Sequence, residues 1–178
     1  MKSFNYKYAF AFLVLLGVFA LAIYLMKKES VGNPTPVLLT WNSFDVGFNL
    51  AKNTEKKVLV DVYTDWCGWC KKMDSEVYTD REVVKLINDH FILVKLNAES
   101  GNSLTFRGKT LSEADLAHEL GVSGYPTTLF FDHNANPITD FPGYAAPERF
   151  SKVLDFIGKD YYKTVSFQEY VQRQPSNQ

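Results

Sequence analysis

The sequence predicts an α/β fold with a central mixed sheet of about four to five strands flanked by helices. Val58–Tyr63 (VLVDVY) is β-branched and apolar, which is typical of a strand buried on both faces, and Phe91–Leu96 (FILVKL) is the next strand. A helical pattern lies between them, and strand, helix and strand in succession favour parallel neighbours joined by a right-handed crossover. With 178 residues, of which 46% are hydrophobic, the chain can fill the core of one domain.

The N-terminus is the most biased part of the chain. Residues 8–26 (YAFAFLVLLGVFALAIYLM) carry no charge and nearly reach the length that a helix needs to cross a bilayer. We expect residues 1–28 to form a signal anchor of a single-pass protein in the inner or plasma membrane, with the folded domain in the periplasm or outside the cell. Two alternatives are a signal peptide that is cleaved to give a soluble exported protein, and an anchor whose domain faces the cytoplasm.

Residues 29–39 (ESVGNPTPVLL) are expected to be a linker, since one glycine and two prolines disfavour a helix there. The folded domain should then span residues 40–178. It opens with Trp41–Ala51, where apolar side chains recur at helical spacing, and the strand Val58–Tyr63 follows.

Two helical stretches are expected between the first two strands. One runs from the cysteines through Val77, and the other covers Arg81–Asn88 with Asp80 as its N-terminal cap. After the second strand, residues 97–110 form a polar insertion. A further helix is expected to begin at Ser112.

The last part of the domain contains two more strands and two more helices. Thr127–Phe131 is apolar, and Pro137–Phe141 begins with a proline, which places that strand at a sheet edge. Pro147 opens an amphipathic helix whose inner face carries Phe150, Val153, Leu154 and Ile157. Ser166–Arg173 is expected to add a short C-terminal helical extension.

The only two cysteines of the chain, Cys67 and Cys70, lie within one short stretch, DWCGWC. A structural zinc site needs four ligands, and the three histidines are scattered along the sequence. Covalent haem attachment needs a histidine where Lys71 stands. A purely structural disulfide across so short a loop removes little entropy from the unfolded chain. These alternatives are weaker than a redox pair, which requires neither a metal nor an organic cofactor.

The placement of the pair after a buried strand favours redox chemistry. If a helix begins at Cys67–Gly68, unpaired backbone N–H groups and the helix dipole lower the pKa of the Cys67 thiol. Cys67 would then attack a disulfide, and Cys70, one turn further on, would release the mixed intermediate.

Two motifs in this order resemble the thioredoxin superfamily: VLVDVYTDWCGWCKKM at residues 58–73 and GVSGYPTTLFF at residues 121–131. The resemblance covers nearly all of residues 40–160. It is greatest to the thioredoxin-like domains of exported reductants, including the C-terminal domain of transmembrane thiol–disulfide interchange proteins. It implies a thioredoxin-like fold and a thiol–disulfide oxidoreductase activity.

The resemblance also suggests roles for acidic residues near the cysteines. Asp61 matches the buried carboxylate that carries a proton to and from the second thiol, and burial should raise its pKa. A solvent-facing Asp61 is the alternative. Asp74 matches a second acidic position in the interchange proteins, although an exposed helical acid is the commoner explanation.

Further positions match the substrate-binding surface of the family. Pro126 matches a cis-proline that faces the cysteines, with an ordinary trans turn as the alternative. The backbone of Tyr125, just before it, would pair with an extended substrate segment. Trp66 and Trp69 would form an apolar rim, although Trp66 could instead be partial core. Gly68-Trp69 stands where general reductants have Gly-Pro, which leaves the direction of electron flow open.

The function expected from these observations is reduction of protein disulfides outside the cytoplasm. The partners are protein disulfides, a membrane or soluble electron donor, and the membrane through residues 8–26. With 19 basic and 20 acidic side chains, the chain gives no electrostatic reason to bind nucleic acid. A disulfide oxidase or isomerase, and a non-catalytic peptide-binding module of the same fold, are the alternatives.

Overall fold

The computed structural model describes residues 15–24 and 38–173. The chain divides into two units, residues 1–36 and 37–178. In the first unit, residues 15–24 are helical. Residues 8–14 and 25–26 of the expected membrane segment, and residues 29–37 of the expected linker, lie outside the described residues. Among the residues that are described, we find no helix with the length and apolar character needed to span a bilayer.

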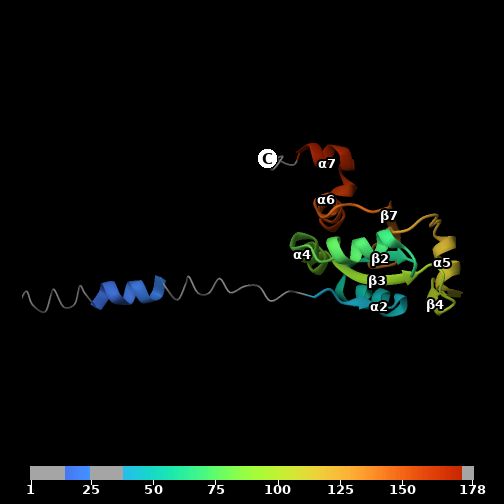
Figure 1. Ribbon diagram of the computed structural model, residues 1–178, viewed down its shortest axis with the longest axis horizontal. Coiled ribbons are helices and arrows are strands. Elements are labelled where there is room, and N and C mark those ends of the chain that lie inside the picture. Colours follow the sequence, from blue (N-terminus) through green and yellow to red (C-terminus); the bar gives the residue numbers. More distant parts are fainter. Residues whose placement is uncertain (1–14, 25–37, 174–178) are drawn as a thin grey trace, which may run out of the picture. The chain divides into compact units, whose positions relative to one another are not determined.

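A five-stranded mixed sheet forms the centre of the second unit (Figure 1). In spatial order its strands are β1 (Trp41–Asn42), β3 (Phe91–Asn97), β2 (Lys57–Tyr63), β6 (Thr127–Phe131) and β7 (Pro137–Pro142). β1 and β2 run parallel to β3, whereas β6 is antiparallel to both β2 and β7. The predicted parallel pairing and the edge position of the strand that begins at Pro137 are both confirmed.

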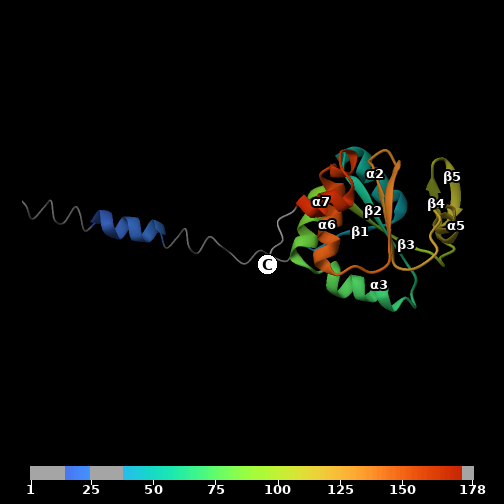
Figure 2. The same ribbon diagram turned by 90° about the horizontal axis from the view of Figure 1, so that it is seen from above.

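Helices cover both faces of this sheet (Figure 2). One face packs against α2 (Phe44–Thr54) and α5 (Glu113–Glu119). The other face packs against a helical layer formed by α3 (Gly68–Lys72), a π-helical turn η1 (Met73–Val77), α4 (Arg81–His90) and α6 (Pro147–Gly158). After a 3₁₀ turn η2 (Tyr161–Lys163), α7 (Phe167–Arg173) packs on α6 through Phe167 and Tyr170, which lie against Phe156.

Alternation along β2 decides which side chains reach which helices. Val58, Val60 and Val62 point into the core on the α2 side. Leu59 points to the opposite side, towards α3, α4 and α6. Because side chains alternate between the two faces of a strand, Asp61 follows Leu59 to the α3 side and enters an otherwise apolar layer.

Several local predictions are confirmed. The Asp80 side chain accepts hydrogen bonds from the backbone N–H groups of Glu82 and Val83, which caps α4. Ser112 caps α5 in the same manner, by accepting a hydrogen bond from the Asp115 N–H. The four apolar residues expected on the inner face of the helix that begins at Pro147 are all buried.

The helix expected from Trp41 begins later, at Phe44, and this prediction was wrong at its start. Trp41–Asn42 instead pairs with β3, and the Asn42 side-chain amide donates to the Leu93 carbonyl at 2.9 Å. Apolar spacing alone does not separate a two-residue strand from the first turn of a helix. As a result, the Trp41 ring lies beside β3 and close to Lys95.

Residues 97–110, expected as a polar insertion, contain part of a β-hairpin formed by β4 (Ser103–Phe106) and β5 (Lys109–Ser112). Its two-residue turn, Arg107-Gly108, has positive φ values of 50° and 78°. Such a turn matches the twist of paired strands, and Gly108 adopts it without steric cost. The hairpin is held by Phe106, whose ring lies 5.5 Å from Phe44 and 6.0 Å from Phe48.

Candidate active site

The two cysteines lie where the chain leaves β2 and enters α3. They form a disulfide with an S–S distance of 2.05 Å. Cys67 is the N-terminal cap of α3, and its sulfur accepts a hydrogen bond from the Cys70 backbone N–H at 3.0 Å. Both residues are nearly inaccessible, at 4% and 2% exposure.

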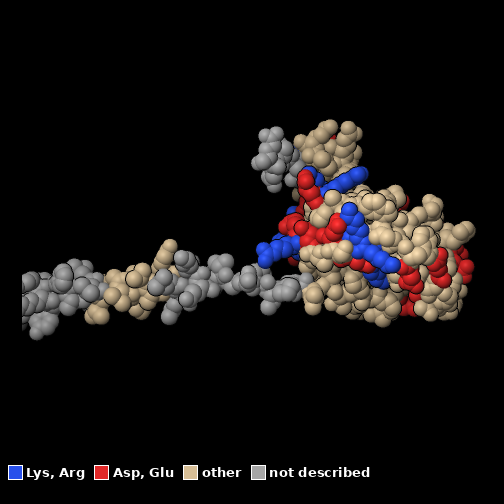
Figure 3. All heavy atoms as spheres, viewed as in Figure 1, with Lys and Arg blue, Asp and Glu red and all other residues tan. Residues whose placement is uncertain are grey.

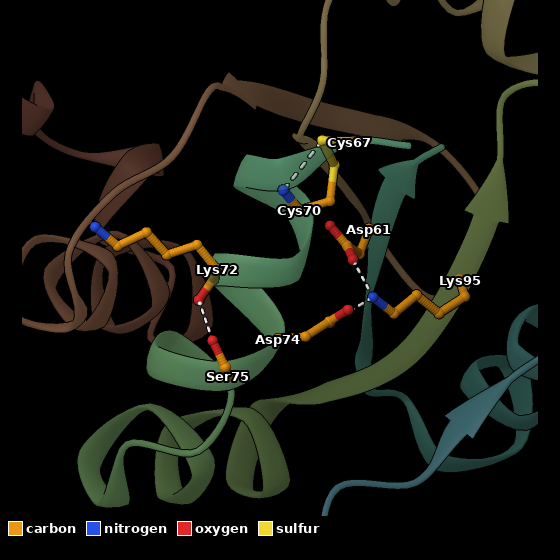
Figure 4. Close-up of polar contacts among 7 residues, drawn as sticks. All are labelled: Asp61, Cys67, Cys70, Lys72, Asp74, Ser75 and Lys95. Atoms are coloured by element: carbon orange, nitrogen blue, oxygen red, sulfur yellow. Dashed lines mark hydrogen bonds and ion pairs between the residues drawn. A yellow bond between two sulfur atoms is a disulfide. The ribbon is translucent and has the colours of Figure 1, made fainter. Parts of the chain in front are cut away.

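Asp61 lies between the disulfide and the side chain of Lys95 (Figure 4). The carboxylate is completely buried, so the alternative of a solvent-facing aspartate is wrong. Its Oδ2 atom accepts a hydrogen bond from Lys95 Nζ at 2.5 Å. The structure therefore brings a negative charge, a positive charge and the cysteine pair into one small volume.

Lys95 was missed in the sequence and joins two of the predicted acidic residues. Its ammonium group contacts Asp61 and also the Asp74 carboxylate, at 2.6 Å. The rings of Trp41 and Tyr63 lie 4.5 Å and 5.0 Å from the same nitrogen, which suits a partly desolvated cation. The strand sequence FILVKL could have indicated this role of Lys95, because a lysine inside a buried strand needs a partner of opposite charge.

Asp74 is about half exposed and reaches the group only through Lys95. It lies in the π-helical turn that follows α3, one turn beyond Cys70. An exposed helical acid and an acidic position near the cysteines, the two explanations given for Asp74 from the sequence, therefore both describe it in part. It is an exposed helical acid, and it belongs to the ion cluster under the cysteines.

Burial and charge oppose each other in this cluster. Desolvation raises the pKa of Asp61, and the attraction of Lys95 offsets only part of that rise. Burial also disfavours the charged form of Lys95, but the two carboxylates outweigh it and raise the pKa of Lys95 above its ordinary value. The net result is that the pKa of the Asp61 carboxyl lies above its ordinary value.

Four aromatic side chains, Trp66, Trp69, Tyr125 and Tyr144, form what we term the aromatic rim. Trp66 packs edge-on against Tyr125 at 6.1 Å, and Trp69 lies 5.3 Å from Tyr144. The two tryptophans are 67% and 58% exposed, so Trp66 is not part of the core. Sequence reasoning missed Tyr144, because it follows β7 and is far from the motifs.

Polar contacts fix both ends of the aromatic rim. The Trp66 indole N–H donates to the Glu99 carboxylate at 2.9 Å. At the other end, the Tyr144 hydroxyl donates to Glu76 at 2.9 Å, and Lys72 Nζ lies 4.9 Å from the Tyr144 ring. These contacts hold large apolar surfaces open to solvent in defined orientations.

The Tyr125–Pro126 peptide bond is cis, which confirms the expected isomer. Pro126 is buried, and its carbonyl accepts a hydrogen bond from Gly143 N–H at 2.8 Å. This bond ties the Tyr125–Pro126 loop to the loop that carries Tyr144. Gly68 is exposed, and a Cβ atom added there would meet nothing within 4 Å, so this glycine leaves the approach to Cys67 open.

Charge on the domain surface is mixed. On the face seen in Figure 3, basic side chains lie next to acidic ones rather than in one separate patch. Within residues 15–24 and 38–173, no group of three or more His, Cys, Asp or Glu side chains is arranged to hold a metal ion.

Comparison with known families decides which fold family this is. Residues 44–158 match the family described as a thioredoxin-like domain. The chain belongs to the thioredoxin-like family. The observed fold agrees, because a thioredoxin-fold protein from Helicobacter pylori superimposes with a TM-score of 0.63 at 20% identity, over 82% of this chain and 96% of that one.

Relatives of this thioredoxin-like chain include proteins named for disulfide chemistry. It is 29% identical over 112 residues to the thiol:disulfide interchange protein DsbD of Photorhabdus laumondii, which covers 62% of this chain and 18% of that protein. It is also 29% identical over 119 residues to the protein disulfide isomerase-like 2-2 of Oryza sativa, which covers 67% of this chain and 28% of that protein. The chain thus matches less than a third of the length of these two curated relatives.

We expect Asp61→Asn to change how the stability of the oxidised protein depends on pH. Because the pKa of Asp61 is raised by burial, its stabilising contribution is fully present below the ordinary value of 3.8 and is lost as pH rises through the folded value. As the pH rises from 3.8 through the raised pKa of Asp61, the unfolding free energy of wild type should therefore fall relative to that of Asp61→Asn. Urea unfolding at a series of pH values measures this difference.

Asp140→Asn is the matched control, because Asp140 is an exposed aspartate on β7 of the same sheet. Its stability should follow that of wild type at every pH. If Asp61→Asn also runs parallel to wild type, Asp61 does not have the raised proton affinity described above.

Proposed function

We propose that this chain is a protein thiol–disulfide oxidoreductase that acts chiefly as a reductant of protein disulfides. The observation that carries the proposal is the arrangement of three groups, Cys67, Cys70 and Asp61. The Cys67 sulfur is held at a helix start by the Cys70 N–H, Cys70 lies one turn further along α3, and the fully buried Asp61 lies beneath the pair. Each step of disulfide exchange has a group in place to perform it.

The first step is attack by the reduced Cys67 on a partner disulfide. The backbone N–H that contacts the sulfur stabilises a thiolate at this position. The thiolate forms a new S–S bond to one partner sulfur, and the other partner sulfur leaves as a thiolate that takes up a proton. A mixed disulfide between Cys67 and the partner results.

The second step releases the partner. Asp61 accepts the proton of the Cys70 thiol, and the Cys70 thiolate attacks the Cys67 sulfur. The mixed disulfide breaks, the partner leaves with a second reduced thiol, and Cys67 and Cys70 are joined as the structure has them. Two electrons have then passed from the domain to the partner, and an external donor must return them.

The aromatic rim and the cis-proline loop provide the surface for the partner. An extended segment would place its backbone against that of Tyr125 and its flanking side chains on Trp66 and Trp69. Because Cys67 is almost fully enclosed while both tryptophans are exposed, the partner gains apolar contact as its sulfur enters. Gly68 keeps the entry free of a side chain.

The direction of electron flow is the finer part of the proposal. Similarity to a thiol:disulfide interchange protein supports a reductant. Oxidation or isomerisation of disulfides is the second candidate, supported by similarity to proteins named disulfide isomerases. The Gly68-Trp69 pair between the cysteines does not decide between them.

The location that we propose is outside the cytoplasm, with residues 1–28 as a membrane anchor and the domain in the periplasm or outside the cell. The apolar, uncharged run at residues 8–26 and its flanking lysines support this proposal. An anchored reductant would need a membrane or soluble electron donor that can reach the aromatic rim.

Replacing Cys70 by Ser should trap substrates. Cys67 can still attack, but no thiol remains to release the partner, so mixed disulfides accumulate. We expect covalent adducts on non-reducing gels that disappear with dithiothreitol, and none with Cys67→Ser. Equal adduct formation by the two variants would contradict the assigned order of attack.

The reduction potential separates the two directions of electron flow. Equilibration of the full chain with glutathione should give a potential below about −200 mV if the protein is a reductant. The fraction of reduced protein can be followed by alkylation and mass spectrometry. A value well above about −200 mV would instead support the oxidase or isomerase.

Labelling with a membrane-impermeant maleimide tests the location. In the Cys70→Ser variant, Cys67 has no internal partner, and we expect it to be labelled in whole cells once its mixed disulfides have been reduced and the reductant has been washed out. An endogenous cytoplasmic thiol protein serves as the control and should be labelled only after lysis. Cys67 labelling that also requires lysis would place the domain inside the cell.

A further inference from the structure

One row of polar side chains crosses the apolar sheet face that packs against α3. Asp61 on β2 pairs in register with Lys95 on β3 and with Thr128 on β6. Residues that pair directly across neighbouring strands present their side chains to the same face of the sheet. From the helix layer above, Tyr78, the residue that ends the π-helical turn, packs over this row.

Three oxygen atoms in this row lack a partner. The Oδ2 atom of Asp61 is paired with Lys95, but Oδ1 has no hydrogen-bond partner in the described part of the chain. The same is true of the Tyr78 hydroxyl and the Thr128 hydroxyl. All three residues are buried, and buried polar atoms in proteins are almost always hydrogen-bonded to protein or to water.

The local backbone explains why a tyrosine hydroxyl reaches this place. The Tyr78 N–H bonds the Met73 carbonyl at 3.0 Å, five residues back, which widens the helix at this turn. Cys70, Asp74 and Tyr78 follow at intervals of four; Cys70 and Tyr78 are buried, whereas the half-exposed Asp74 contacts Lys95. The Tyr78 ring is fixed edge-on by Trp41 at 4.9 Å and by Phe150 at 5.9 Å.

We propose that Tyr78 and Thr128 hold one buried water, and that this network donates a hydrogen bond to the Asp61 carboxylate. Tyr78 and Thr128 are then positioning residues that act through Asp61. A hydrogen bond to a carboxylate favours its charged form, so the network limits how far burial raises the proton affinity of Asp61. This inference rests on the proposed function only in assigning the Cys70 proton to Asp61.

Electrostatic interactions around the carboxylate agree with this assignment. The groups that face Asp61 are Lys95 from β3 and Asp74 and Tyr78 from the helix layer, while β6 contributes the uncharged Thr128. Burial raises the pKa of Asp61, and the Tyr78 hydroxyl acts in the opposite direction. This direction is the one expected if the two hydroxyls, through the water between them, donate a hydrogen bond to the carboxylate.

Packing alone does not require the hydroxyl groups of Tyr78 and Thr128. A phenylalanine would fill the space of the Tyr78 ring between Trp41 and Phe150, and a valine would fill that of Thr128 on a strand. Each hydroxyl therefore adds a buried polar atom that an isosteric apolar residue would avoid, and without a hydrogen bond it would reduce stability.

The test is the titration of the Asp61 carboxyl carbon by ¹³C NMR in the oxidised full chain. We expect Tyr78→Phe to raise the pKa of Asp61 by about one unit, because the charged form loses a hydrogen bond. Thr128→Val should raise it in the same direction, and Thr128→Ser should restore the wild-type value. The double variant should shift less than the sum of the single shifts, because both hydroxyls bind one water.

Tyr170→Phe is the matched control. Tyr170 is also a buried tyrosine, but its hydroxyl donates to Asp155 on α6 at 2.6 Å. Its loss should leave the Asp61 titration unchanged. If Tyr78→Phe leaves the titration equally unchanged or lowers the pKa, the network is overturned.

A kinetic readout separates this inference from the proposed function. In reduced protein, Tyr78→Phe should move the pH profile of partner release to higher pH by the same shift that NMR measures. An NMR shift without any change in the pH profile would show that the network exists and that Asp61 does not handle the Cys70 proton. Active protein with no NMR shift would overturn the network alone.

Discussion

The burial of one carboxylate beneath the cysteine pair is the constraint on which this site depends. Asp61 stands where an apolar residue would be expected on β2, and its charge costs free energy in that environment. The structure compensates with Lys95, which reaches it from the neighbouring strand and is itself held by Asp74 and aromatic rings. We propose that the remaining imbalance, which keeps the pKa of Asp61 raised, prepares it to exchange a proton with Cys70.

The surface around this centre is built in the opposite manner. Inside, charges are enclosed by apolar packing, whereas outside, large apolar rings are held in the open by polar contacts. Glu99 fixes Trp66, and Glu76 fixes Tyr144, so the aromatic rim is ordered before any partner arrives. Pre-ordered aromatic surface lowers the entropic cost of binding an extended segment. We infer that the domain recognises the backbone and apolar neighbours of a disulfide rather than a particular charge pattern.

Much of the fold and the main site residues follow from the sequence because their signals are local. Strong apolar runs give β2 and β3, and Asp80 and Ser112 mark helix starts by their own side chains. The misses come from contacts between distant segments. Trp41–Asn42 becomes a strand because β3 offers it a free edge, and the β4–β5 hairpin is stabilised by Phe106 packing on α2. Lys95 and Tyr144 join the site only through folding, since they lie in other elements than the motif around Cys67.

We propose that Asp61 takes the proton of Cys70 so that the partner can be released. The most direct measurement is the rate of partner release from a preformed mixed disulfide on Cys67, followed by stopped flow near neutral pH. We expect Asp61→Asn to slow this release by about a hundredfold, while attack by Cys67 on a partner disulfide keeps its rate. Equal release rates in wild type and Asp61→Asn would show that Asp61 does not take the Cys70 proton.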